Sequence, residues 1–214
     1  MLVLAFDTSA PVVSVAVHDG SEVLAAASGA GTMAHGELLA PAIDQALREA
    51  GVLIRDITDI AVGVGPGPFT GLRVGVVTAL TLGSSLRVPT HGVCSLDVMA
   101  AEVGGSTAFL IATDARRKEV YWALYDGGPQ GPRRIEGPAV DRPDALAALH
   151  PNVPVTGRGA ELYGDVLRAQ PGPIDPSAAV LAAGVAAGTF AELPLEPLYL
   201  RRPDVAEPAA PKRA

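Results

Sequence analysis

The chain of 214 residues contains a single cysteine, Cys94, and this scarcity excludes any disulfide within it. A lone thiol fits a reducing compartment, where structural disulfides rarely form. Lysine is almost as scarce, since it occurs only at Lys118 and Lys212, and the formal net charge is −7. Phosphate binding depends on clustered basic residues, so a chain this acidic is a poor candidate for binding nucleic acid alone.

Signals for export and for membrane insertion are also missing. The opening MLVLAF has no basic residue and meets Asp7 at once, which is unlike a signal peptide. The longest uncharged run, residues 176–191, is shorter than the roughly 20 apolar residues of a spanning helix. We therefore expect a soluble, cytoplasmic protein without membrane contact.

The common local motifs of nucleotide and metal chemistry are absent. The chain has no Gly-Lys pair, which excludes a P-loop, and no H-x-x-x-H, H-E-x-x-H or C-x-x-C spacing. No residue pattern supports a metallopeptidase.

An internal repeat is present instead. A strand-like run, an Asp turn, a second strand-like run and an Asp-Gly pair follow one another from residue 2 and again from residue 109. Asp7 and Asp114 occupy the same place in the two copies, with an offset of 107 residues. The repeat predicts a two-lobed α/β fold with duplicated lobes, each starting with a β-meander.

The repeat also suggests where the lobes divide. We expect an N-terminal lobe over residues 1–104, a C-terminal lobe over 105–202 and a disordered tail over 203–214. Apolar periodicity predicts helices at residues 35–51, 71–86, 95–102, 144–149, 160–169 and 177–191.

The stretch GVGPGPFTGLRVGV, residues 63–76, has the form of a phosphate-binding loop that opens a helix. Such loops bind phosphate through backbone N–H groups, however, and Pro66 and Pro68 have none. Thr70 as N-cap would leave a helix start able to hold one anion weakly. The alternative is a rigid strand-to-helix turn.

Small residues recur every fourth position along the following helix, at Gly71, Gly75, Ala79 and Gly83. Such a ridge allows another element to approach closely. The residues alone leave open whether this element belongs to a second subunit or to the same lobe.

Asp7 and Asp114 stand where a nucleotide-using enzyme of this architecture would face Mg²⁺ and phosphate across a cleft. The simpler interpretation of each is turn formation. An ATP-dependent phosphotransferase or ATPase is therefore the alternative function.

Six segments together closely resemble the bacterial TsaB/YeaZ family, and the resemblance covers the chain up to about residue 202. They are LAFDTSAPVVSVAV, HGELLAPAID, AVGVGPGPFTGLRVGV, VPTHGVCSL, ATDARRKEVYWALY and EPLYLR. The resemblance implies the actin-like ATPase (ASKHA) fold, in agreement with the internal repeat.

The resemblance also implies a non-catalytic role, because this family is an inactive paralogue that binds the catalytic subunit TsaD. With the ATPase TsaE, the complex transfers threonylcarbamoyl to adenosine 37 of tRNAs reading ANN codons. The resemblance further implies that the chain alone binds no cofactor, although ATP or ADP can bind in the assembled complex. It implies that the chain reaches tRNA only through that complex, and that in isolation the chain can form a homodimer. Whether the basic run Arg116–Lys118 contacts tRNA stays open.

The resemblance finally implies site residues. The metal-binding H-x-x-x-H of the catalytic paralogue falls on Ser95 and Met99, neither of which is a credible ligand there. The family's dimer contact uses two helices, here 35–50 and 71–86, and Asp7, Thr8 and Asp114 would line a vestigial nucleotide cleft. The residues expected at the partner interface are Leu39, Ile43, Leu47, Gly71, Arg73, Gly75, Ala79 and Gly83.

Overall fold

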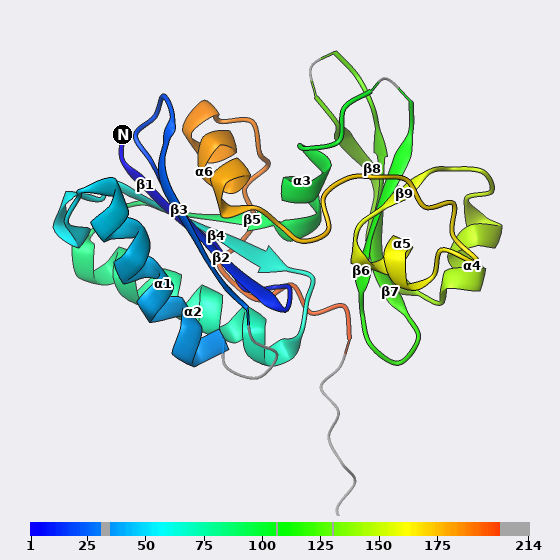
Figure 1. Ribbon diagram of the computed structural model, residues 1–214, viewed down its shortest axis with the longest axis horizontal. Helices are drawn as coiled ribbons and strands as arrows, with labels where there is room; N and C mark the ends of the chain where they lie inside the picture. Colours follow the sequence, from blue (N-terminus) through cyan, green and yellow to red (C-terminus); the bar gives the residue numbers. More distant parts are fainter. Residues whose placement is uncertain (31–34, 106, 130, 202–214) are drawn as a thin grey trace, which may run out of the picture.

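The computed structural model describes residues 1–30, 35–105, 107–129 and 131–201. The tail expected to be disordered, 203–214, lies outside these residues. Two β-sheets form the centres of two lobes that lie side by side (Figure 1). This arrangement is the two-lobed actin-like fold.

The first sheet has the strand order β3-β2-β1-β4-β5. β1 pairs antiparallel with β2 and parallel with β4, so a meander and a parallel crossover meet at β1. The strands are β1 (Val3–Asp7), β2 (Val12–His18), β3 (Val23–Ala30), β4 (Asp59–Gly65) and β5 (Thr90–Cys94).

The second sheet repeats this plan with the order β8-β7-β6-β9. β6 pairs antiparallel with β7 and parallel with β9, as β1 does with β2 and β4. The predicted duplication is therefore confirmed in the strand topology. The strands are β6 (Phe109–Asp114), β7 (Val120–Asp126), β8 (Arg133–Asp141) and β9 (Val155–Thr156).

Helices cover both faces of the first sheet (Figure 1). α1 (His35–Ala50) and α2 (Phe69–Leu86) pack on one face, and α6 (Ala178–Ala187) packs on β1 and β2 from the other. Successive side chains of a strand point to opposite faces. Accordingly Leu4 and Phe6 join the core under α1, while Val3 and Ala5 join the core under α6.

The remaining helices are short. A 3-10 turn η1 (Ile54–Asp56) precedes β4, and α3 (Ser95–Ala100) follows β5 directly. α4 (Pro143–Leu149) and α5 (Arg158–Leu162) belong to the second sheet's side. The helix expected over 160–169 is thus wrong in extent, because it begins two residues earlier and ends at Leu162, just before Gly164.

The segment after α6, residues 189–201, is here called the C-terminal strap. The Leu193 N–H donates to the Gly92 carbonyl at 2.8 Å, and the Leu198 N–H donates to the Val64 carbonyl at 2.8 Å. At its end, Arg201 Nη1 donates to the Ala115 carbonyl at 2.9 Å. The strap therefore runs along the first sheet and ends on the second lobe. The strap and α6 both lie on the first sheet. The predicted division at residue 104 assigns these two segments to the second lobe, and that division stays a prediction.

Within the described residues, one helix has the length and hydropathy that crossing a membrane would require, namely α2. It packs against β4 and α1, as the apolar helix of a folded α/β lobe does.

Candidate functional site

The two lobes meet at a small cavity lined from both sides. Its volume is about 20 Å³, which is room for about one water molecule, whereas small-molecule sites measure about 300–1,000 Å³. The cavity is lined by Ser9, Ala10, Pro11, Pro66, Pro68, Ser95, Leu96, Thr113, Asp114, Arg116, Arg158, Asp175 and Pro176. At this place, residues of both lobes leave little room between them.

Asp7 ends β1 beneath this cavity and is buried, with 1% of its surface exposed. Its Oδ1 accepts hydrogen bonds from the Ser9 N–H at 2.7 Å and the Ser9 hydroxyl at 2.6 Å, and its Oδ2 accepts from the Ser95 hydroxyl at 2.6 Å. Burial raises the pKa of Asp7, although the hydrogen bonds from Ser9 and Ser95 oppose that shift. Both carboxylate oxygens are thus engaged within the protein.

Gly63 of β4 closes the remaining side of Asp7. A Cβ at this position would lie 1.7 Å from Asp7 Oδ2 and 2.7 Å from Ser95 Oγ, so only glycine lets the strand pass. The Ser95 hydroxyl also accepts from the Gly65 N–H at 3.2 Å. Asp7, Ser95 and β4 form one locked cluster.

Thr8 anchors α2 to the end of β1. Its side chain is fully buried, and its hydroxyl donates to the Gly71 carbonyl at 2.7 Å. A Cβ on Gly75 would lie 2.4 Å from the Thr8 Oγ1. Thr8 therefore joins strand to helix.

Asp114 is the only one of the three expected cleft residues that lines the cavity. Its Oδ1 accepts from the Arg116 N–H at 2.8 Å, and its Oδ2 lies 3.7 Å from Arg116 Nε. Arg158 and Asp175 also line the cavity and form an ion pair, with Arg158 Nε 3.0 Å from Asp175 Oδ1. The hydrogen bond with Asp175 raises the pKa of Arg158.

Sequence reasoning missed Arg158 and Asp175. The internal repeat offered a signal for Arg158, because this residue follows β9, the strand that pairs parallel with β6. The equivalent strand β4 leads into the glycine-rich loop, so the residues after β9 had to reach the same cleft.

The glycine-rich loop is a tight strand-to-helix turn. The Gly65–Pro66 peptide is cis, and a Cβ on Gly67 would lie 2.5 Å from the Ser9 carbonyl oxygen. The expected N-cap at Thr70 is wrong. Pro68 is the N-cap with φ −62°, and its carbonyl accepts from the Leu72 N–H at 3.0 Å. Its ψ of 137° gives the extended backbone that is usual for an N-cap residue.

Ser95 and Met99, the two positions expected to correspond to metal ligands of the catalytic paralogue, are buried. Ser95 contacts Asp7, and Met99 lies in an apolar cluster with Cys94, Leu96 and their neighbours. Across the part of the chain that the structure describes, no group of three His, Cys, Asp or Glu side chains could hold a metal ion.

The interface residues expected on α1 need correction. Leu39, Ile43 and Leu47 are 2%, 8% and 8% exposed and pack into the core of the first sheet. The helical spacing that identified them marks the face of α1 that covers its own sheet. They are not available to a partner in this structure.

The small-residue ridge of α2 also faces inward. Ala79 is fully buried, and a Cβ on Gly83 would lie 2.1 Å from the Thr90 Oγ1. The ridge, including Gly71 and Gly75, brings α2 close to the sheet. Of the eight expected interface residues only Arg73 is exposed, and it stacks on Phe69 at 3.8 Å while donating to the Tyr199 hydroxyl at 3.0 Å.

The outward face of α2 carries different residues. Val77 is 59% exposed and Leu80 is 45% exposed, although both are large and apolar. These positions flank the ridge in the sequence. Uncovered apolar side chains on an otherwise packed helix indicate a surface that another protein could cover.

Residues 30–206 match a family model described as TsaD: tRNA N6-adenosine threonylcarbamoyltransferase. "Uncharacterized protein ML0378" of Mycobacterium leprae is 42% identical over 95% of this chain and 55% of its own length. The "tRNA threonylcarbamoyladenosine biosynthesis protein TsaB" of Escherichia coli is 36% identical over 61% of this chain and 58% of its own length. The chain thus spans little more than half the length of these two relatives.

A solved structure described as "YeaZ from Pseudomonas aeruginosa" is similar along its whole length. It superposes with a TM-score of 0.75 at 30% identity, covering 93% of this chain and 99% of that one.

Proposed function

The chain belongs to the TsaB/YeaZ family, and from this premise we propose that it serves tRNA threonylcarbamoyladenosine biosynthesis as a non-catalytic subunit. In this proposal it binds the catalytic subunit TsaD and, with the ATPase TsaE, supports threonylcarbamoyl transfer to adenosine 37 of tRNAs reading ANN codons. Its place of action would be the cytoplasm.

One observation carries the proposal that the subunit is not itself catalytic. Asp7, at the position where a nucleotide-using lobe would present a carboxylate, is enclosed by Ser9, Ser95 and the backbone at Gly63. The cavity above it, of about 20 Å³, is far smaller than a nucleotide site. A carboxylate that neither substrate nor metal can reach has a structural role and not a catalytic one.

The outward surface of α1 and α2 is the proposed TsaD contact. The buried residues first expected there are replaced by the exposed pair Val77 and Leu80, with Arg73 and its stacked partners at the start of α2. Aromatic and arginine side chains around an apolar centre are typical of protein interfaces. A homodimer of the isolated chain would use the same surface.

The alternative, an ATP-dependent phosphotransferase or ATPase, draws on one observation. Asp7 and Asp114 end the equivalent central strands of the two lobes. It requires the Arg158–Asp175 pair to separate so that the cleft opens. Titration calorimetry at millimolar ATP distinguishes the scaffold function from the ATP-dependent one. If the chain is a scaffold, we expect no saturable binding heat from this chain alone.

The main test is reconstitution of tRNA modification with purified TsaD and TsaE, with and without this chain. We expect product only when all three proteins are present. Mutation of the two metal-binding histidines of TsaD is the control, and it should abolish product. Product formation by this chain without TsaD would contradict the proposal.

A further inference from the structure

The connection between β6 and β7 has an unusual backbone. Arg116, Arg117 and Lys118, here called the basic turn, are all exposed and have φ values of 61°, 54° and 60°. This left-handed region favours glycine and is rarely adopted by three successive residues with long side chains. The turn places three cationic side chains where glycine would fit with less strain.

The basic turn is held by its own hydrogen bonds and by the end of the C-terminal strap. The Glu119 N–H donates to the Arg116 carbonyl at 3.0 Å, and the Ala115 N–H donates to the Glu119 carbonyl at 3.0 Å. Arg201, at the end of the C-terminal strap, donates to the Ala115 carbonyl and forms an ion pair with Glu119. The cations are therefore presented on a fixed backbone, which lowers the entropy lost when they bind.

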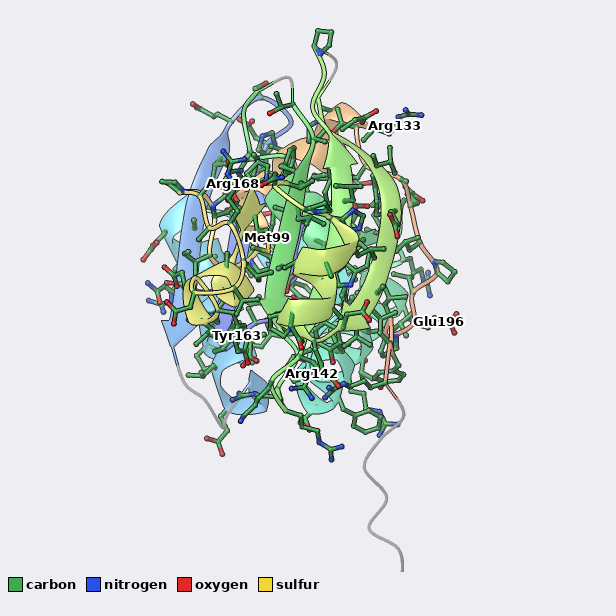
Figure 2. All side chains as sticks on the ribbon, turned by 90° about the vertical axis from the view of Figure 1, so that its right-hand side faces the viewer. Met99, Arg133, Arg142, Tyr163, Arg168 and Glu196 are labelled. Atoms are coloured by element: carbon green, nitrogen blue, oxygen red, sulfur yellow. The ribbon has the colours of Figure 1, made fainter. Side chains whose placement is uncertain are left out.

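The surface around the turn is basic although the protein is acidic. β7 and β8 pair Val120 with Asp141, so the next residue, Arg142, lies beside the turn. Figure 2 shows Arg142 at the opposite end of this lobe from Arg133. In the described part of the chain, the basic turn and Arg142 are exposed, whereas Asp114, Glu119 and Asp141 are partly buried. Asp114 Oδ2 lies 3.7 Å from Arg116 Nε, and Oδ1 of the exposed Asp144 lies 3.5 Å from Arg142 Nε.

We propose that the basic turn contacts the phosphate backbone of the tRNA on which the assembled complex acts. This inference rests on the proposed function. Projecting cations on a convex turn suit an extended polyanion, whose phosphates lie outside the protein. A free nucleotide would need a concave site, and the neighbouring cavity holds about 20 Å³.

The net charge of −7 explains why the contact works only in the complex. Like charges repel, so the isolated chain binds tRNA poorly, whereas an assembled complex places the turn beside RNA that other subunits hold. The turn adds phosphate contacts without reading sequence.

The test removes one or two charges with substitutions that are compatible with the left-handed backbone. Lys118→Gly and the double variant Arg117→Gly/Lys118→Gly suit the left-handed conformation, so both should fold. Arg87→Gly is the matched control, because Arg87 is also an exposed left-handed arginine with φ 59°, at the end of α2 in the other lobe. Lys118→Arg keeps the charge.

The measurement is binding of fluorescently labelled tRNA to the complex with TsaD and TsaE, from 50 to 200 mM salt. Each lost phosphate contact makes the slope of log K against log salt shallower by about 0.7–0.9. Between 50 and 200 mM salt the wild-type affinity should therefore fall roughly three-fold more per lost contact than that of the variant, and about ten-fold more than that of the double variant. Arg87→Gly and Lys118→Arg should match the wild type.

Heterodimer formation is measured in parallel so that two failures stay separate. If the wild-type chain does not bind TsaD, the proposed function fails and this inference with it. If the complex forms and modifies tRNA, but the double variant keeps the wild-type affinity and salt slope, the inference alone is overturned. Weakened TsaD binding by the glycine variants would also overturn it, because the turn would then contact protein.

Discussion

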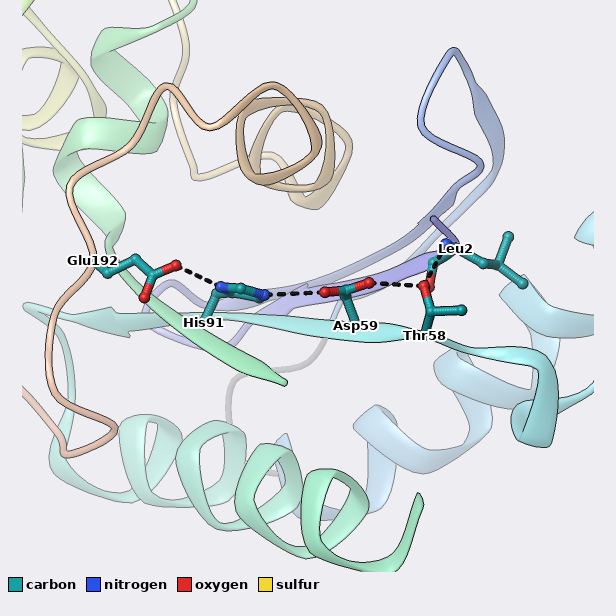
Figure 3. A network of polar contacts seen from close by, with 5 residues as sticks. All are labelled: Leu2, Thr58, Asp59, His91 and Glu192. Carbon is teal, nitrogen blue, oxygen red and sulfur yellow. Dashed lines mark hydrogen bonds and ion pairs between the residues drawn. The ribbon is translucent and has the colours of Figure 1, made fainter. Parts of the chain in front are cut away.

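Glu192 places a carboxylate oxygen 2.6 Å from Nδ1 of His91, a residue 101 positions earlier in the chain. The other ring nitrogen, Nε2, lies 3.3 Å from Asp59 Oδ1, and Asp59 in turn accepts from the Thr58 hydroxyl at 2.7 Å (Figure 3). Only a protonated imidazole donates from both nitrogens. The C-terminal strap is therefore fastened to the edge of the first sheet through His91, and the ring donates to both carboxylates only when it is protonated.

This contact predicts a pH-dependent stability. Burial alone would lower the pKa of His91, but hydrogen bonds from the ring to Glu192 and Asp59 raise it above its usual value of 6.5. A raised folded-state pKa means that the stabilisation is complete below the unfolded pKa and is lost as pH rises through the folded one. Glu192→Gln should therefore lower the unfolding free energy at pH 5.5 more than at pH 8.5.

The expected loss is below about 1 kcal/mol, because the Glu192 side chain is 67% exposed. Urea unfolding at the two pH values measures it. Glu196→Gln removes the same charge from an exposed position on the same strap and should change little. An equal loss at both pH values would show that the histidine charge is not involved.

The proposed TsaD surface predicts the effect of placing charge on α2. Val77→Glu and Leu80→Glu should each weaken TsaD binding by at least about ten-fold, about 1.4 kcal/mol, because a carboxylate would be buried in an apolar contact. Calorimetric titration with TsaD gives the affinity, and circular dichroism verifies the fold.

Leu162→Glu is the matched control, since Leu162 is 56% exposed on the second lobe. It should bind TsaD as the wild type does. Normal binding by folded Val77→Glu and Leu80→Glu would place the interface elsewhere. Gly75→Glu is unsuitable for this purpose, because the new side chain would collide with Thr8 rather than meet a partner.

The contrast between α2's ridge and its outward face shows what the sequence can and cannot predict. The duplicated strand order could be predicted, because a turn residue such as Asp7 or Asp114 and the flanking apolar alternation are local signals. The direction of the small-residue ridge could not. It depends on Thr8, which lies far from α2 in sequence, and on Thr90, which begins the strand after α2. Both meet the helix only in the folded sheet.

The site was predictable to a similar degree. The position of Asp114 at the cleft followed from the repeat. The pair Arg158 and Asp175 joins the first residue of the short helix α5 to a loop, and neither segment has a periodic pattern. The left-handed conformation of the basic turn could not be predicted, because the turn contains no glycine or asparagine, the residues that usually adopt it.

Because the Asp7 carboxylate is enclosed, we predict that this position tolerates substitution by a neutral residue of the same shape. Burial raises the pKa of Asp7, so its ionisation disfavours the folded state as pH rises from the unfolded toward the folded pKa. Asp7→Asn stays neutral at every pH, and its amide can still pair with Ser9 and Ser95. At pH 7 we expect unfolding free energy equal to or above that of the wild type, with an undiminished yield of modified tRNA.

Asp7→Ala separates packing from chemistry. It leaves the Ser9 and Ser95 hydroxyls without their acceptor and should cost about 1–3 kcal/mol, measured by urea unfolding. The yield should survive wherever the variant remains folded. A catalytic acid or base would instead contribute about 10²–10⁴-fold, so a loss of that size in folded Asp7→Asn would identify Asp7 as functional.

The close approach of α2 to its sheet makes a final prediction. Gly75→Ala places a methyl group 2.4 Å from the Thr8 hydroxyl oxygen, so either α2 or Thr8 must shift. Overpacking of this kind costs about 1–3 kcal/mol, measured as a lower urea midpoint with an unchanged slope. Gly104→Ala is the control, because a Cβ there meets nothing within 4 Å and its backbone is not left-handed.

The cause can be tested by removing the atom that the methyl group would meet. Thr8→Ala lacks the hydroxyl and also its hydrogen bond to the Gly71 carbonyl, so it destabilises by itself. If the steric argument holds, adding Gly75→Ala to this background costs much less than adding it to the wild type. Equal costs in the two backgrounds would mean that Gly75 is required for another reason, and that the ridge does not fix how closely α2 lies on the sheet.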